Sequence, residues 1–371
     1  MRTAAQNITA LASHPPTLHL SGGRDSRLTS AAFLSLSTPF RVLTFGDVSA
    51  ESETAKQLAE LAGERAQHEI IKRGTDSMEE MTISQRQTIS MAIWDGDMNP
   101  NRLSQRFISP APVRQLTITG GGGEIAHGNY YASRAMLDRV QKLTRRTDRL
   151  VSAFTGLGVS LDAAGEVKSF CDSLYEDMAR LGLAGPTMLD AFYLTERFRR
   201  WVAAGHNTSS PLLFGSPSFV RYSMDQTPDA RLANQVHSDF ISNLIPNWRG
   251  VPFFKAKPSD RDEKLEKGLR IWQGERSEEF FDVLLKATND PLWDGRSVLG
   301  AAVEVLRGNS QPRMESVFQR VLWRQGFITH MNALNRDIQK AWDPIRESSQ
   351  ASPTQPRILS RLKLRRSPST R

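Results

Sequence analysis

A short turn near the N-terminus combines residue types that bind phosphate and a metal ion. Residues 20–26, which we name the first glycine loop, read Leu20, Ser21, Gly22, Gly23, Arg24, Asp25 and Ser26. Glycines lack β-carbons, so a phosphate can closely approach the backbone N–H groups of such a turn. The carboxylate of Asp25 is a suitable magnesium ligand. We predict a phosphate site at this loop, and the alternative is a strand-to-helix turn that binds no ligand.

A second glycine-rich turn follows further along the chain. Residues 119–124, the second glycine loop, read Thr119, Gly120, Gly121, Gly122, Gly123 and Glu124. The glycines let the backbone pass close to a ligand, and Glu124 is placed to reach the same cation as Asp25. A glycine hinge is the alternative, and the match to a dinucleotide-binding fingerprint is weak, because no acidic residue ends a following strand. We predict that Asp25 and Glu124 share one magnesium ion.

Strand and helix signals alternate through the first 135 residues. Strands are expected at residues 17–20, 41–45, 67–71 and 116–119, and helices at 26–36, 51–62, 78–93 and 124–137. Asp25 or Ser26 would cap the helix that follows the first loop. The alternation predicts an α/β fold, a parallel sheet with helices on both faces. Ligands bind beyond the carboxyl ends of such strands, and both glycine loops fall there.

Beyond residue 135 the strand signal fades and helical periodicity takes over. It covers residues 136–157, 187–204, 228–244, 262–289, 296–307 and 314–342. We expect the stretches between them at 205–222 and 245–260 to be long connections. The expected organisation is an ATP-binding α/β core over 1–135, a mainly helical region over 136–346 and a basic, disordered tail over 347–371.

The composition is that of an ordinary globular protein. Hydrophobic residues make up 39% of the chain and charged residues 24%. No run of apolar residues approaches the length of about 20 residues that a membrane-spanning helix needs. The N-terminus lacks the hydrophobic region of a signal peptide, so we expect a cytoplasmic protein without a membrane partner.

The net charge, the single cysteine and the histidines each bear on which partners, disulfides and metal sites we expect. The net charge of +8 includes six basic residues beyond residue 356, so the rest of the chain is nearly neutral and nucleic acid is not an expected partner. The single cysteine, Cys171, excludes an internal disulfide, and we expect it to pack in the interior. The seven histidines show no metal-ligand spacing and are expected to be structural.

The two loops together resemble the synthetase domain of the asparagine synthetase family. That family has Leu-Ser-Gly-Gly-x-Asp-Ser in its first loop, and the first glycine loop matches it throughout. Residues 52–61, followed by Gly63 and His68, are similar to the family's next helix. The second glycine loop stands where the family has Ser-Gly-Glu-Gly-x-Asp-Glu, and the resemblance extends to about residue 260. It implies an adenine nucleotide alpha-hydrolase-like fold and a loop that splits ATP into AMP and pyrophosphate.

Three features depart from the family's pattern. The chain begins one helix before its first strand, so we expect no glutamine-hydrolysing domain with an N-terminal cysteine. Gly121 replaces the loop glutamate that acts in asparagine formation, and Glu124 replaces the metal-binding aspartate. The resemblance therefore supports ATP-dependent acyl activation better than it supports asparagine as the product.

The activity implied by the resemblance is that of an ATP-dependent carbon–nitrogen ligase. Such an enzyme adenylates a carboxylate, here a small molecule or a peptide, and passes it to ammonia or another amine. A separate amidotransferase or a precursor peptide would be its partner. ATP would be held by Leu20, Ser21, Gly22, Gly23, Asp25, Ser26, Phe45, Thr119 and Gly120. Mg²⁺ would be held by Asp25 and Glu124.

A late lysine stabilises the transition state in this family. Lys255 or Lys257 is the nearest candidate for that catalytic role. For each of them, an ordinary surface lysine is the alternative.

Two other functions fit the same loops. The first is a catalytically degenerate domain that binds nucleotide and scaffolds a partner enzyme, which Gly121 and the expected lack of a glutaminase domain favour. The second is another enzyme of the same loop superfamily that modifies a nucleotide or a tRNA. The nearly neutral part of the chain before residue 357 and the lack of a Cys-x-x-Cys pair argue against tRNA thiolation.

Overall fold

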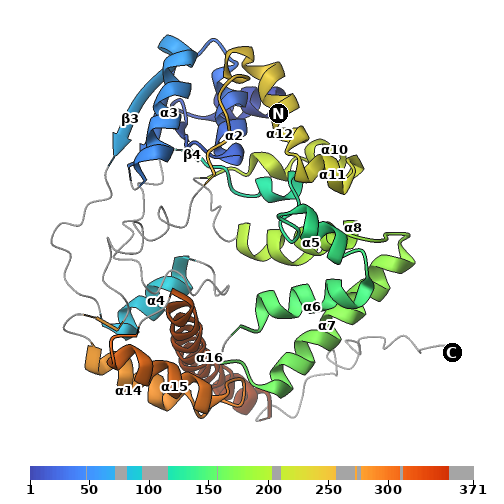
Figure 1. Ribbon diagram of the computed structural model, residues 1–371. Helices are drawn as coiled ribbons and strands as arrows, with labels where there is room; N and C mark the ends of the chain where they lie inside the picture. The colour runs from blue at the N-terminus through green and yellow to red at the C-terminus, as the bar shows by residue number, and fades with distance from the viewer. Residues whose placement is uncertain are drawn as a thin grey trace. The chain divides into compact units, whose positions relative to one another are not determined.

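The structure is a computed structural model (Figure 1). Its chain falls into two compact units. It describes residues 1–46, 48–71, 82–93, 116–156, 158–202, 210–255, 272–273, 277–309 and 312–350. The units are Met1–Gln325 and Gly326–Arg371. Where it is described, the second unit consists of the later part of helix α16 (Pro312–Gln350). The sites discussed below belong to the first unit.

Four parallel strands form a sheet in the N-terminal part of the chain. They are β1 (Thr17–His19), β2 (Phe40–Phe45), β3 (Ala66–Ile71) and β4 (Thr117–Ile118). Their order across the sheet is β3-β2-β1-β4, and each neighbouring pair is parallel. The parallel sheet of an α/β fold, predicted from the alternating signals, is therefore confirmed.

An apolar row crosses the middle of this sheet. Leu18 of β1 pairs with Val42 of β2 on one side and with Ile118 of β4 on the other. Each of the three is at most 1% exposed. Residues in register share a face of the sheet, and burying an aliphatic side chain contributes about 1.5–3 kcal/mol. This row therefore helps to fix the register that brings the ends of β1 and β4 together.

Helices alternate with the first strands as the periodicity predicts. They are α1 (Arg2–Leu11), α2 (Arg24–Leu34), α3 (Ser49–Ala62) and the 3-10 turn η1 (Gly63–Arg65). In α3 the residues at the predicted helical spacing, Ala55, Leu58, Ala59 and Ala62, are buried. The helix ends where Gly63 adopts a positive φ of 64°.

The helix expected directly after the second glycine loop does not form as predicted. A single 3-10 turn, η3 (Gly123–Ala126), stands there, and α5 (Arg134–Arg139) begins only after Ser133. The Ser133 side chain caps α5 by accepting a hydrogen bond from the Met136 N–H. Gly128 has a φ of 71°, which a right-handed helix cannot contain, so the segment turns before the helix starts.

Helix α4 (Ile83–Ile93) was expected to cross over between β3 and β4 and to cover the sheet. Instead, its Ile83 N–H donates at 2.9 Å to Glu279 of α14 (Ser277–Ala287). The Gln87 side chain donates to the Leu322 carbonyl of α16 at 2.6 Å. These hydrogen bonds connect α4 to the C-terminal helices α14 and α16. The short-range sequence pattern of residues 78–93 does not indicate these contacts.

The rest of the described chain is mainly helical. Its larger elements are α6 (Leu143–Phe154), α7 (Leu161–Arg180), α8 (Thr187–Phe192), the π-helix η4 (Tyr193–Val202), α10 (Pro217–Asp225), α11 (Pro228–Leu232), α12 (Gln235–Leu244), α14 (Ser277–Ala287) and α15 (Gly295–Leu306). Two short 3-10 turns are η5 (Leu213–Gly215) and η6 (Pro246–Trp248).

Several of the expected boundaries change in this region. Helix α10 occupies part of 205–222, which was predicted to be a connection. The helix predicted over 228–244 is divided at Asn234, whose left-handed φ of 60° separates α11 from α12. The basic tail predicted from residue 347 begins inside α16, and residues 351–371 lie outside the described residues.

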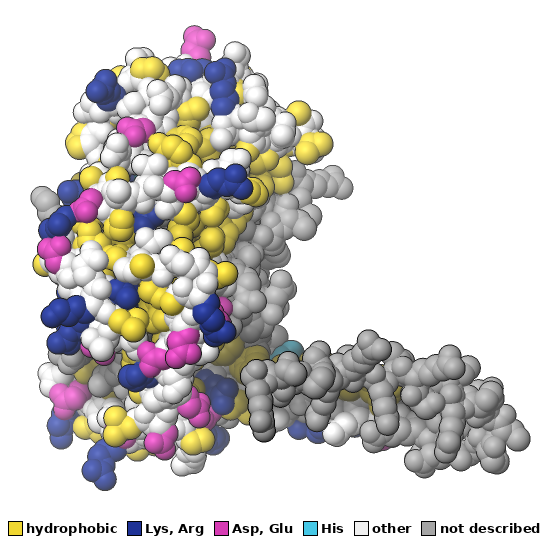
Figure 2. Space-filling view, turned by 90° about the vertical axis from the view of Figure 1, so that its right-hand side faces the viewer, with side chains coloured by type: hydrophobic (Ala, Val, Ile, Leu, Met, Phe, Trp, Pro, Cys, Tyr) yellow, Lys and Arg dark blue, Asp and Glu magenta, His cyan; other side chains and the backbone are white. Residues whose placement is uncertain are grey.

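The surface view shows charges of both signs. On the face in Figure 2, Lys and Arg side chains are interspersed with Asp, Glu and hydrophobic side chains. None of the described helices combines the length and the apolar character that are needed to span a bilayer.

Candidate functional site

The two glycine loops leave neighbouring strands of the sheet. The first follows β1 and the second follows β4, and these strands are hydrogen-bonded neighbours. From β1 the chain proceeds through β2 to β3 on one side, then returns to place β4 on the other side of β1. Such a reversal of strand order opens a crevice at the carboxyl ends of the strands, where ligands of α/β proteins bind.

Direct contact between the loops depends on two glycines. A β-carbon added to Gly120 would lie 2.9 Å from the backbone carbon of Asp25 and closer still to the Ser26 nitrogen. A β-carbon added to Gly123 would lie 2.5 Å from Cγ of Asp25. Neither position has room for a side chain, so the second glycine loop packs its backbone directly on the start of α2.

The first glycine loop is closed by hydrogen bonds of its own serines. The Ser21 and Ser26 hydroxyl oxygens lie 2.7 Å apart. The Ser21 N–H donates to Oγ of Ser26 and the Gly23 N–H donates to Oγ of Ser21, both at 3.1 Å. A phosphate oxygen that binds here would meet two hydroxyl groups and the N–H groups that they now hold.

Helix α2 starts earlier than the sequence predicted. Its N-cap is Gly23, which makes no side-chain cap, and Asp25 belongs to the first turn instead of capping it. The free N–H groups of a helix start and the helix dipole favour anions. The loop therefore directs an uncapped helix N-terminus at the crevice.

Asp25 lies between two histidines. Nε2 of His237 on α12 lies 2.7 Å from its Oδ1, and Nε2 of His127, after η3, lies 3.6 Å from its Oδ2. Burial raises the pKa of the Asp25 carboxyl, but the two histidines outweigh burial and hold that pKa well below its usual range. Burial lowers the pKa of His237. A neutral His237 therefore donates its Nε2–H to an ionised Asp25.

Glu124 is held by a tyrosine on the π-helix. The Tyr193 hydroxyl donates to Oε2 of Glu124 at 2.7 Å. Burial and the Glu124 charge raise the pKa of Tyr193, so its hydroxyl stays protonated as a donor. The charges of Asp25 and Glu124 both act on the Arg24 guanidinium, whose pKa burial lowers. The two predicted metal ligands thus share one neighbourhood, and their joint binding of a metal stays a prediction.

Segment 251–255 packs against the first glycine loop. The Phe254 N–H donates to the Gly22 carbonyl at 2.8 Å. A β-carbon at Gly22 would lie 2.7 Å from Cβ of Phe254, so this approach also requires glycine. The contact brings Lys255, more than two hundred positions away in sequence, to the loop.

A cavity of about 480 Å³ lies where these segments meet. Six predicted site residues line it: Ser21, Gly23, Asp25, Ser26, Gly120 and Lys255. Four further described residues also line it: Arg24, Asn234, Phe253 and Phe254. Its volume falls within the range of about 300–1,000 Å³ that is typical of small-molecule sites.

Five predicted residues lie outside this lining: Leu20, Gly22, Phe45, Thr119 and Glu124. Leu20 is committed to the sheet, because its N–H donates to the Leu43 carbonyl at 2.9 Å and its carbonyl accepts from the Thr44 hydroxyl at 2.8 Å. Phe45, at the end of β2, stacks edge-on against His19. Lys257 lies outside the described residues.

Sequence reasoning missed four neighbours of the site. His127 and His237 were expected to be structural, yet they contact Asp25. Arg24 occupies the variable position of the loop pattern, and its Nη1 donates to Oδ1 of Asn234 at 2.5 Å. His127 lies three residues after Glu124 and Arg24 lies inside the loop, so proximity was a usable signal for both. Nothing local marks His237 or Asn234.

Two further observations concern metal ligands and similar sequences. The described residues include no group of three or more His, Cys, Asp and Glu side chains placed to hold a metal ion. Neither protein-family models nor curated proteins match this sequence with significant similarity.

Proposed function

We propose that this protein is an ATP-dependent ligase of the asparagine synthetase type, which adenylates a carboxylate and then forms an amide. The observation that carries the proposal is the cavity at the reversal of strand order. There the first glycine loop, Gly120 and Lys255 face one space of about 480 Å³. The first glycine loop and a lysine from a distant part of the sequence line the same cavity, which supports a nucleotide site there.

The chemistry has two steps. The substrate carboxylate attacks the α-phosphorus of ATP, and the bond to the β-phosphate breaks to release pyrophosphate. An amine then attacks the acyl carbon, loses its proton and expels AMP. Negative charge grows on the leaving pyrophosphate, and preorganised donors and cations stabilise it best. The Ser21 and Ser26 hydroxyls, the start of α2 and the Lys255 ammonium supply such groups.

The residues present fit a magnesium ion bound together with ATP. Magnesium at nucleotides is held by one or two carboxylates plus phosphate oxygens. The carboxylate of Asp25 is ionised, and among the described residues the hydrogen bond from Tyr193 occupies only Oε2 of Glu124. Bound there, the ion would offset charge on the phosphates. His237 and Tyr193 orient the two carboxylates.

Product analysis tests the reaction. The protein is incubated with MgATP and a panel of carboxylates and amines, and AMP and pyrophosphate are measured. Because the first glycine loop has no P-loop lysine to brace the terminal phosphates, we expect AMP and pyrophosphate. ADP and phosphate would contradict the mechanism. With Gly121 in the second loop, aspartate and ammonia should give little or no asparagine.

The same panel separates the alternatives. MgATP binding without turnover of any substrate would favour the degenerate, scaffolding domain. Turnover that requires a nucleotide or tRNA acceptor would favour the other loop-superfamily enzyme.

A further inference from the structure

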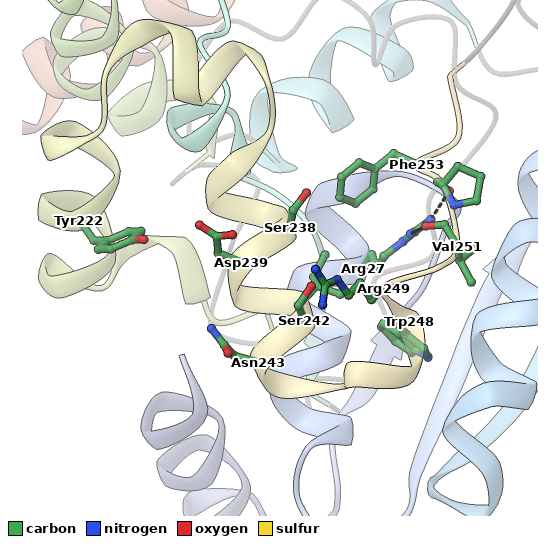
Figure 3. Close-up of a pocket in the computed structure, with 12 residues that line it drawn as sticks. Arg27, Tyr222, Ser238, Asp239, Ser242, Asn243, Trp248, Arg249, Val251 and Phe253 are labelled. Carbon is green, nitrogen blue, oxygen red and sulfur yellow. Dashed lines mark hydrogen bonds between the residues drawn. The ribbon is translucent and has the colours of Figure 1, made fainter.

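Arg27 joins the first glycine loop to segment 251–255. Its Nη1 donates to the Val251 carbonyl at 2.6 Å, and its Nη2 donates to the Pro252 carbonyl at 2.9 Å and to the Gly22 carbonyl at 3.0 Å. Figure 3 shows the Arg27 side chain reaching from its helix to Val251, with Phe253 on the same segment. One guanidinium therefore bonds both segments that carry the candidate site.

Burying the charged Arg27 side chain costs free energy of folding. It is 1% exposed, and it makes no ion pair with a carboxylate in the part of the chain that the structure describes. Burial lowers its pKa to about 10, so it is still charged at neutral pH. Burying a cation costs desolvation free energy, which the hydrogen bonds to three carbonyl oxygens must offset.

The Arg27 guanidinium also packs over the ring of Phe253. The guanidinium carbon lies 4.8 Å from the centre of the Phe253 ring, and Phe253 lines the cavity together with Lys255. A planar donor that serves three carbonyls and one ring fixes both distance and angle, which a lysine cannot do. Gly22 belongs to the loop, whereas Val251 and Pro252 precede Lys255 by a few residues.

We propose that Arg27 is a positioning residue that holds segment 251–255 on the first glycine loop and so places Lys255 at the nucleotide cavity. The part that concerns nucleotide rests on the proposed function. The clamp itself does not, so the two can be tested separately.

The first measurement needs no nucleotide. Trypsin cleaves after Lys255, and the rate of that cut reports how often the segment leaves the loop. In Arg27→Met the rate should rise about tenfold or more, because hydrogen bonds from a charged donor are lost. Arg27→Lys keeps the charge without the fork and should be intermediate. Arg65→Met is the control, since Arg65 donates to the Leu34 and Ala62 carbonyls away from this segment.

The second measurement follows acetylation of Lys255 by an N-hydroxysuccinimide ester, with Lys286 as the reference lysine. In the wild type MgATP should protect Lys255. In Arg27→Met this protection should be lost while the dissociation constant for MgATP changes much less, a split that general destabilisation would not produce. If Arg27→Met does not fold, Arg27→Lys serves in both measurements.

The outcomes separate the two claims. Cleavage after Lys255 at the wild-type rate in both Arg27 variants would overturn the clamp. Wild-type protein that binds MgATP without protecting Lys255 would overturn its placement at the cavity. If the wild type binds no MgATP, the proposed function fails, and the proteolysis result alone then decides whether Arg27 is a clamp.

Discussion

A methyl group at Gly120 should separate the two glycine loops. In Gly120→Ala the new β-carbon would lie 2.9 Å from the backbone carbon of Asp25, with the Ser26 nitrogen nearer still. Ordinary contacts of this kind are about 3.5 Å or longer. The obstructing atoms are backbone atoms at the start of α2, so no rotamer change relieves the clash. Overpacking of this sort costs about 1–3 kcal/mol, and we expect Gly120→Ala to lose stability in that range.

The assay is urea unfolding together with the shift in melting temperature that MgATP causes. The control is Gly165→Ala in α7, where the added β-carbon would meet no atom within 4 Å apart from its chain neighbours and the backbone of its own helix. Alanine is the better helix former there by about 1 kcal/mol, so the control should be slightly stabilised and keep its MgATP response. Gly120→Ala should lose most of that response, because its loops no longer meet. Wild-type stability with a full MgATP response would refute the packing argument.

Three further predictions concern the interior of the first unit. Arg231 bonds Asp190 at 2.7 Å with neither side chain exposed by more than 2%, so Arg231→Met should lower the free energy of unfolding by about 3 kcal/mol in urea titrations; a loss near zero would show that the pair is dispensable. Burial raises the pKa of Asp190 to about 6, against the lowering charge of Arg231. Between about pH 4 and 6 the folded state therefore holds a proton that the unfolded chain, with a pKa of 3.8, releases, whereas at neutral pH the carboxylate is ionised and pairs with Arg231. The contribution of this proton to the free energy of unfolding is complete below about pH 4 and is lost as the pH rises through about 6. The stability of the wild type relative to Asp190→Asn should therefore fall, and not rise, across that pH range. Cys171 is fully buried with a pKa raised to about 11 by burial, so Ellman's reagent should react with it only after unfolding, and rapid labelling of the native protein would contradict this.

The elements with strong local signals were predictable. The strands around Leu18 and Val42 alternate or cluster apolar residues, and α3 shows its buried positions directly in the spacing of Ala55, Leu58 and Ala59. The glycine loops carry their own chemistry in their residue types. These features depend on neighbours in sequence, which is why sequence reasoning reached them.

The features that could not be predicted from the sequence depend on contacts between distant parts of the chain. The break at Asn234 permits the turn between α11 and α12, and α12 packs on α2, which delivers His237 to Asp25. The partners of Arg27 lie more than two hundred positions away. Helix α4 follows β3 in the chain as a crossover helix would, but its hydrogen bonds go to α14 and α16. Tertiary contacts decided each case, and no local propensity encodes them.

The most direct test of the proposed function is titration of MgATP into the wild type and into Asp25→Asn. Asparagine keeps an oxygen that can accept from His237 but removes the charge that would hold magnesium. At a hundredfold excess over its dissociation constant, MgATP should stabilise the wild type by about 2.7 kcal/mol. We predict that Asp25→Asn loses most of this stabilisation while its unliganded fold stays intact. An equal response of the two proteins would contradict the assignment of the first glycine loop as the nucleotide site.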